Sequence, residues 1–133
     1  MEDATKLDFD ALERFLKDGD IDAAKRLVTP ANAQTRDRLR LPVGVLWHLC
    51  GFGPLDDTGL LYHFVELGAT LELDHAGERT TPLHEAAGSG KPRLLRALLD
   101  LGTPVDIFDG DEYTPLRWSL LLQYNQVECA RLL

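Results

Sequence analysis

The four histidines are the side chains that could most readily serve as acid–base catalysts or metal ligands: His48, His63, His75 and His84. No two of them have the spacing that would place two metal ligands on one helix face. The sequence also has no glycine-rich phosphate loop, no Cys-x-x-Cys pair and no Gly-x-Ser-x-Gly motif. We therefore expect no catalytic residue, no metal and no cofactor. An enzyme built on scattered His and Asp side chains is the weakest of three functional hypotheses.

Four acidic residues within seven positions form a second group that could do chemistry: Asp106, Asp109, Asp111 and Glu112. The alternation of Asp109 and Asp111 around Gly110 resembles the start of a calcium-binding loop. Such a loop needs a longer series of ligands that ends in a bidentate carboxylate. We therefore expect a solvated acidic loop instead.

A repeated sequence motif indicates which helices position these residues. Thr81-Pro82-Leu83-His84 is followed 33 residues later by Thr114-Pro115-Leu116. A threonine hydroxyl can cap a helix whose first residue is proline. Gly88-Ser89-Gly90 then turns the chain into a second, leucine-striped helix that ends at Gly102. Two helices this short cannot bury their own apolar faces, so such units must stack.

Weaker copies of the pattern surround this unit. They begin near residues 8, 42, 80 and 113, with repeats of approximately 8–30, 42–68, 80–102 and 113–133. The chain is therefore expected to be a single all-α domain over residues 1–133. Its first and last units should be the atypical ends of the stack.

The Thr-Pro-Leu motif and the 33-residue period between its copies resemble the ankyrin repeat. The resemblance implies a solenoid of four stacked helix-turn-helix repeats joined by short β-hairpin loops. It also implies that His84 makes hydrogen bonds which tie neighbouring units together. The family usually has a glycine two residues before Thr-Pro-Leu, where this chain has Arg79 and Glu112.

Partner contacts in that family usually come from the hairpin tips and the inner-helix surface. Exposed aromatic side chains at such places are typical interface anchors. Phe108 could instead fold back onto its own hairpin, and Leu121 could be buried by a lengthened inner helix. Trp118 fits the core better than it fits a contact surface. The family positions, together with Glu112 and Trp118 beside them, give the partner-binding candidates Glu78, Thr80, Ser89, Phe108, Asp111, Glu112, Tyr113, Trp118 and Leu121.

Composition narrows the class of partner. The 22 acidic and 14 basic residues give a net charge of −8, so nucleic acid is not an expected partner. The acidity serves either solubility or the steering of a basic protein. The acidic N-terminus resembles neither a signal nor a transit peptide, and no apolar run is long enough to cross a membrane. Cys50 and Cys129 lie on apolar faces of different units, which favours reduced thiols in a cytoplasmic protein.

The leading hypothesis is a non-enzymatic module that binds one partner protein through its concave face and acidic hairpin tips, by occlusion or scaffolding. The alternative is an immunity protein that neutralises a cognate toxin, such as a basic nuclease. The last apolar stripe, which includes Val127 and Leu132, reaches the end of the sequence without a closing glycine. Three explanations for this uncapped end stay open. The natural protein continues past Leu133, or the last helix ends in a frayed turn, or a partner covers the apolar stripe.

Overall fold

A computed structural model describes residues 4–35, 44–71, 81–121 and 126–133, except for the side chains of Leu121 and Gln126. Every regular element in these ranges is helical, which agrees with the all-α expectation. The described helices are α1 (Phe9–Asp18), α2 (Ile21–Leu27), α3 (Val45–Gly51), α4 (Thr58–Glu66), α5 (Pro82–Gly88), α6 (Pro92–Asp100), α7 (Pro115–Leu121) and α8 (Gln126–Leu132).

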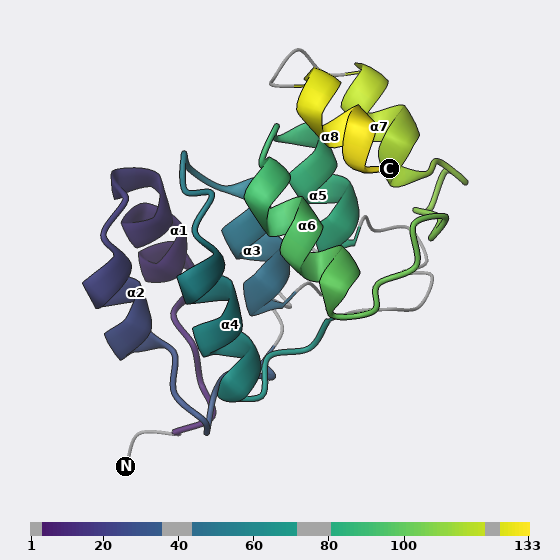
Figure 1. Ribbon diagram of the computed structural model, residues 1–133. Helices are drawn as coiled ribbons and strands as arrows, with labels where there is room; N and C mark the ends of the chain where they lie inside the picture. The colour runs from purple at the N-terminus through teal and green to yellow at the C-terminus, as the bar shows by residue number, and fades with distance from the viewer. Residues whose placement is uncertain (1–3, 36–43, 72–80, 122–125) are drawn as a thin grey trace.

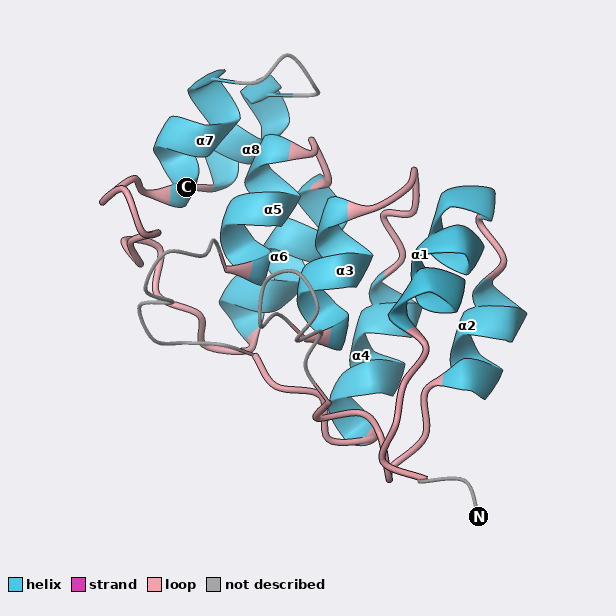
Figure 2. Cartoon of the chain, turned by 180° about the vertical axis from the view of Figure 1, so that it is seen from behind, coloured by secondary structure: helices cyan, strands magenta, loops and turns pink. Residues whose placement is uncertain are grey.

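Consecutive helices pair, and the pairs lie side by side in chain order from α1/α2 to α7/α8 (Figure 1). The odd-numbered helices form one layer, in which α1 contacts α3, α3 contacts α5 and α5 contacts α7. The even-numbered helices form the second layer in the same way, and Figure 2 shows the odd-numbered layer from its own side. This arrangement follows from the shortness of the helices, because each pair buries its apolar faces only against its neighbours.

Acidic residues start several of the helices. The carboxylates of Asp8, Asp20 and Asp57 accept hydrogen bonds from the backbone N–H groups of the first turns of α1, α2 and α4. Thr81 caps α5 as expected, through its hydroxyl and the N–H of His84. Part of the excess of acidic residues is therefore explained by capping, which stabilises each helix start by about 1 kcal/mol.

Two of the glycines with positive φ mark the ends of helices. Gly102 follows α6 with φ of +101°, which confirms the expectation that glycine ends this helix. Gly53 follows α3 with φ of +74°, and a Cβ there would lie 2.2 Å from the backbone oxygen of Leu16. The turn after α3 thus packs directly on the end of α1.

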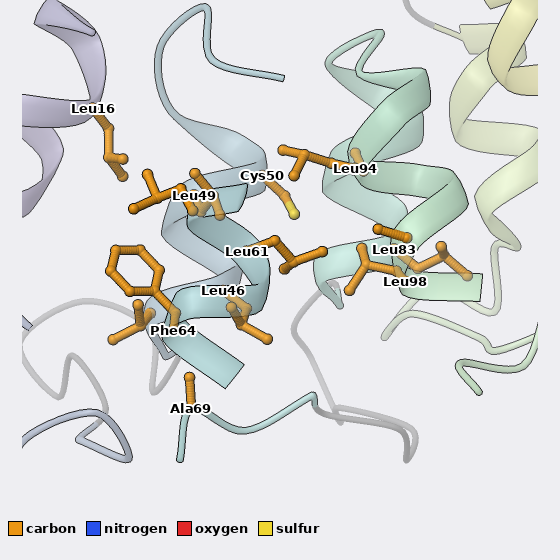
Figure 3. Packing of buried hydrophobic residues seen from close by; sticks show 14 of the residues in the cluster. Leu16, Leu46, Leu49, Cys50, Leu61, Phe64, Ala69, Leu83, Leu94 and Leu98 are labelled. Atoms are coloured by element: carbon orange, nitrogen blue, oxygen red, sulfur yellow. The ribbon is translucent and has the colours of Figure 1, made fainter. Parts of the chain in front are cut away.

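The core runs continuously through the stack. Leu46 and Leu49 of α3 pack with Phe64 of α4 on one side (Figure 3). On the other side lie Leu83 of α5 and Leu94 and Leu98 of α6. All of these side chains are fully buried. Each aliphatic side chain buried in this way stabilises the fold by roughly 1.5–3 kcal/mol relative to leaving it exposed.

The two cysteines belong to the same core. Cys50 and Cys129 are buried and unbridged. Burial raises the pKa of Cys50 to about 12 and that of Cys129 to about 11. Both thiols are therefore protonated and poor nucleophiles at neutral pH.

The second and third helix pairs cap each other's helix ends. The ammonium group of Lys91 donates to the carbonyl oxygens of Leu49 and Phe52 at the end of α3, at 3.1 and 3.2 Å. In return, Asp56 accepts from the N–H groups of Arg93 and Leu94 at the start of α6, at 3.0 and 2.7 Å. Burial lowers the pKa of Lys91. Each charge lies against the helix terminus whose dipole it complements.

The expected β-hairpin loop between α6 and α7 is not formed as a strand ladder. Residues 103–114 make successive turns without a strand. One backbone hydrogen bond of a hairpin is present, from the N–H of Asp109 to the carbonyl oxygen of Tyr113. The N–H of Tyr113 donates to the Asp109 carboxylate and so does not complete the pair. The hairpin expected before α5 falls within residues 72–80, outside the described residues. That all four pairs are ankyrin units of one domain stays a prediction.

Candidate functional site

The segment between α6 and α7, residues 103–114, is here called the acidic loop. It projects from the side of the stack as a long excursion between the two helices (Figure 2). Phe108 is 48% exposed, so its side chain does not fold back into the protein. Val105 is also exposed, as are the carboxylates of Asp106, Asp111 and Glu112. The loop therefore presents two apolar side chains among three acidic ones.

Asp109 is the residue that organises this loop. Its side chain is only 2% exposed, which corrects the expectation of a fully solvated acidic loop. One carboxylate oxygen accepts from the N–H groups of Asp111 and Tyr113 at 2.9 and 2.8 Å, and the other accepts from the Trp118 indole at 2.8 Å. A buried carboxylate requires such partners, and they fix the loop in one conformation.

These hydrogen bonds also decide the ionisation of Asp109. Burial by itself raises the pKa of this carboxyl group. The hydrogen bonds from Tyr113, Trp118 and Asp111 outweigh burial and hold the pKa of Asp109 below its ordinary value. Asp109 is therefore ionised at neutral pH.

His84 links the acidic loop to the helix pair before it. Its Nε2 lies 2.6 Å from the carbonyl oxygen of Tyr113, which can only accept, so Nε2 carries a proton. Its Nδ1 lies 2.7 Å from the hydroxyl of Thr81, which donates to it in the neutral ring. The side chain is fully buried. These contacts confirm the structural role expected for His84 as a tie between units.

Tyr113 and Trp118 have less free surface than Phe108. The guanidinium carbon of Arg117 lies 4.0 Å from the centre of the half-buried Tyr113 ring. Trp118 is also half-buried, and its ring meets that of His84 edge-on at 6.0 Å. Trp118 thus supports Asp109 and His84, and only part of its surface is available to a partner.

Of the remaining candidates, only Glu112 belongs to the acidic loop. Ser89 is half-buried at the end of α5, and Glu112 is exposed in the left-handed region with φ of +64°. Glu78 and Thr80 lie outside the described residues, as does the side chain of Leu121 at the end of α7. The structure brings together Phe108, Asp111, Glu112, Tyr113 and Trp118 in and beside the acidic loop. That this group binds a partner stays a prediction.

Comparison with known families agrees with this local geometry. The family model of the ankyrin repeat matches residues 78–110, which include the Thr-Pro-Leu-His motif, α5, α6 and the acidic loop as far as Gly110. This segment is an ankyrin repeat. No curated protein matches the chain. Ankyrin repeats are typically non-enzymatic units of protein–protein interaction, so the match indicates a protein partner.

The histidines of the described residues lie on separate helices. His48, His63 and His84 lie on α3, α4 and α5, and His75 falls outside the described ranges. Within those ranges, no three His, Cys, Asp or Glu side chains are placed to hold a metal ion. No helix in the described part of the chain is long and apolar enough to cross a membrane.

The layer of even-numbered helices carries a groove that the sequence did not indicate. It has a volume of about 650 Å³ and lies between α4, α6 and α8. Tyr62 contributes an exposed aromatic ring, and Arg93 and Arg96 face the same groove as Asp100 and Glu128. Two positive and two negative side chains balance, so its charge selects no class of ligand. Its lining comes from three different units, which is why no local motif revealed it.

Proposed function

We propose that the protein is a non-enzymatic interaction module whose acidic loop binds one partner protein. The observation that carries the proposal is the exposure of Phe108 on a loop whose backbone is held by Asp109 and His84. An exposed aromatic side chain costs solvation free energy unless a partner covers it, and such residues often dominate binding. The ankyrin repeat that ends in this loop supports a protein as the partner.

The fixed conformation favours tight binding. Three hydrogen bonds to Asp109 and the bond from His84 to Tyr113 order the loop before any partner arrives. A partner therefore does not have to supply the free energy of ordering this segment. The loop acts as a preformed surface, through either occlusion or scaffolding of the partner.

The charges around Phe108 and Val105 favour a basic partner. Asp106, Asp111 and Glu112 are exposed, and the whole chain carries a net charge of −8. A basic protein would be attracted before contact, and its association rate would fall as salt screens the attraction. The apolar pair would then be covered by apolar side chains of the partner.

A pull-down from the source organism tests the proposal. Wild-type protein is compared with a Phe108→Ala/Tyr113→Ala variant whose melting temperature is unchanged. We expect one protein to be captured by the wild type and lost from the variant. A partner retained equally by both proteins would contradict the role of the acidic loop.

A matched control separates the loop from other exposed aromatic surface. Tyr62 is 40% exposed on α4, in the other layer, so Tyr62→Ala removes a comparable ring away from the loop. This variant should capture the partner as the wild type does. A captured partner that is basic and toxic to its own cell would support the immunity-protein alternative over a scaffold.

A further inference from the structure

A buried ion pair joins the first helix pair to the second. Glu13 of α1 is 7% exposed and His48 of α3 is 1% exposed, and Oε1 of the glutamate lies 3.6 Å from Nε2 of the histidine. Ionisable side chains are rarely buried to this degree unless they are paired. The contact lies where α1 packs on α3, at the opposite end of the row from α7 (Figure 1).

The hydrogen bond on the other side of the imidazole decides what this contact contains. Nδ1 of His48 lies 2.7 Å from the carbonyl oxygen of Gly44, which can only accept, so Nδ1 carries a proton. In a neutral ring, Nε2 would then be an acceptor, and the ionised carboxylate that it faces is also an acceptor. The contact between Glu13 and His48 is therefore attractive only if a further proton lies between the two groups.

The surroundings of the imidazole favour this proton on the ring. The ring centre of Phe9 lies 4.7 Å from that of His48, and the ring of Phe52 stacks at 5.6 Å with an interplanar angle of 14°. Aromatic rings attract a cation at such distances. His48 also lies in the last turn of α3, where the helix dipole favours a positive charge. The charged imidazole thus suits both the rings and the carboxylate.

The other charged groups around α3 act in both directions. Lys17 of α1 approaches the ring of Phe52 to 5.4 Å, Lys91 donates to a carbonyl oxygen at the end of α3, and Glu85 of α5 approaches the last residue of that helix. The helix α4, which also packs on α3, carries His63. The two lysines oppose a positive charge here and the glutamate favours one, so these effects offset one another in part.

The other fully buried histidine of the described residues has no need of a second proton. Nδ1 of His84 accepts from the hydroxyl of Thr81, while its Nε2 donates to the carbonyl oxygen of Tyr113. The neutral ring therefore satisfies both of its neighbours. Of these two buried histidines, only His48 lies in a contact that depends on an additional proton.

We propose that this proton makes the docking of the first helix pair, α1/α2, dependent on pH. While His48 is charged, Glu13 is paired and α1 is held on α3. When the imidazole loses its proton, a buried carboxylate faces a bare ring nitrogen, and α1/α2 detaches locally more often. Histidine is the side chain whose charge changes in the physiological range, so docking should weaken as the pH rises through that range. The device uses no residue of the acidic loop and is independent of the proposed function.

Nitrogen NMR of the histidine rings tests the proton itself. In the folded protein at about pH 5.5, both ring nitrogens of His48 should have the chemical shifts of protonated nitrogens. The signal of Nε2 should move toward that of a bare nitrogen as the pH is raised. A bare Nε2 already present at the lower pH would overturn the charged pair.

Amide hydrogen exchange measures the docking. Between about pH 5.5 and about pH 8, the protection factors of α1 and α2 should fall at least ~3-fold relative to those of α5 and α6 in the same molecule. Glu13→Gln should abolish this dependence, because the glutamine amide group can donate to the unprotonated Nε2. If that variant does not fold, His48→Gln replaces it, since it removes the titrating ring and should abolish the dependence as well.

His63→Gln is the matched control, because it removes a histidine from the neighbouring helix α4 and should keep the wild-type dependence. Three exchange results would contradict the proposal. The first is a wild type in which α1 and α2 keep the same protection relative to α5 and α6 across this range. The second is a Glu13→Gln variant with the same dependence as the wild type. The third is a dependence that disappears in His63→Gln.

Discussion

Replacing Asp109 with asparagine should loosen the acidic loop, although the asparagine side chain has the shape and size of the aspartate side chain. The asparagine oxygen can still accept from the N–H groups of Asp111 and Tyr113. The amide NH₂ group then faces the Trp118 indole N–H, now 2.8 Å from the second carboxylate oxygen, so two donors meet. Whichever way the amide is turned, at least one of the three hydrogen bonds is lost.

The expected cost follows from that loss. A hydrogen bond to a charged group contributes about 1.5–3 kcal/mol, so Asp109→Asn should lower the free energy of unfolding by about 2 kcal/mol at neutral pH. Adding Trp118→Phe removes the second donor. In the Asp109→Asn background this change should therefore cost about 1 kcal/mol less than it does in the wild type.

Urea unfolding between pH 7 and pH 3 measures both the size and the origin of the effect. Because the folded-state pKa of Asp109 is lowered, its stabilisation is fully present above the unfolded-state pKa, which is about 3.9. It is lost as the pH falls through the folded-state pKa. The difference between wild type and Asp109→Asn should thus be constant near neutrality and shrink below about pH 4.

Asp111→Asn is the control, because it makes the same chemical change at an exposed neighbour and should alter stability by no more than about 0.5 kcal/mol. The reasoning is refuted if the two variants are equally stable. It is also refuted if the deficit of Asp109→Asn is unchanged at pH 3, since the effect would then not come from an ionised carboxylate.

Two smaller changes test other parts of the fold by urea unfolding. Glu112 has φ of +64°, so Glu112→Gly should relieve strain and raise the free energy of unfolding by up to about 1 kcal/mol. The control Asp111→Gly should lower the free energy of unfolding by a similar amount. Equal effects of the two substitutions would contradict strain at Glu112. Asp56 caps α6 from the loop between α3 and α4, so Asp56→Ala should lower the free energy of unfolding by about 1 kcal/mol. Asp56→Asn should lower it less, because asparagine also caps helices. An Asp56→Ala variant as stable as the wild type would contradict this role.

The parts of the fold that depend on local rules could be predicted from the sequence. Thr81 before a proline gave the start of α5, and Gly102 marked the end of α6. These features depend on the conformational preferences of single residues, which a sequence displays directly. Glu112 replaces the usual glycine of the family, and its positive φ was not predicted from the sequence.

The features that the sequence did not reveal depend on contacts between distant residues. The acidic cluster indicated a solvated loop, because nothing in its composition shows that Trp118, nine residues later, turns back to bind Asp109. The sequence likewise did not show the role of the loop that joins α3 to α4. Asp56 in that loop caps a helix that starts 36 residues further on. Only the packing of one pair on the next creates these bonds.

The central claim is that Phe108 on the acidic loop anchors a protein partner. Its most direct test is the dissociation constant of the captured partner, measured by calorimetry for wild type, Phe108→Ala and Tyr62→Ala. A central anchor contributes about 2 kcal/mol or more, so Phe108→Ala should weaken binding at least ~30-fold, and Tyr62→Ala should leave it within ~2-fold. The account is contradicted if Phe108→Ala binds as tightly as the wild type, or if Tyr62→Ala is the variant that loses the partner.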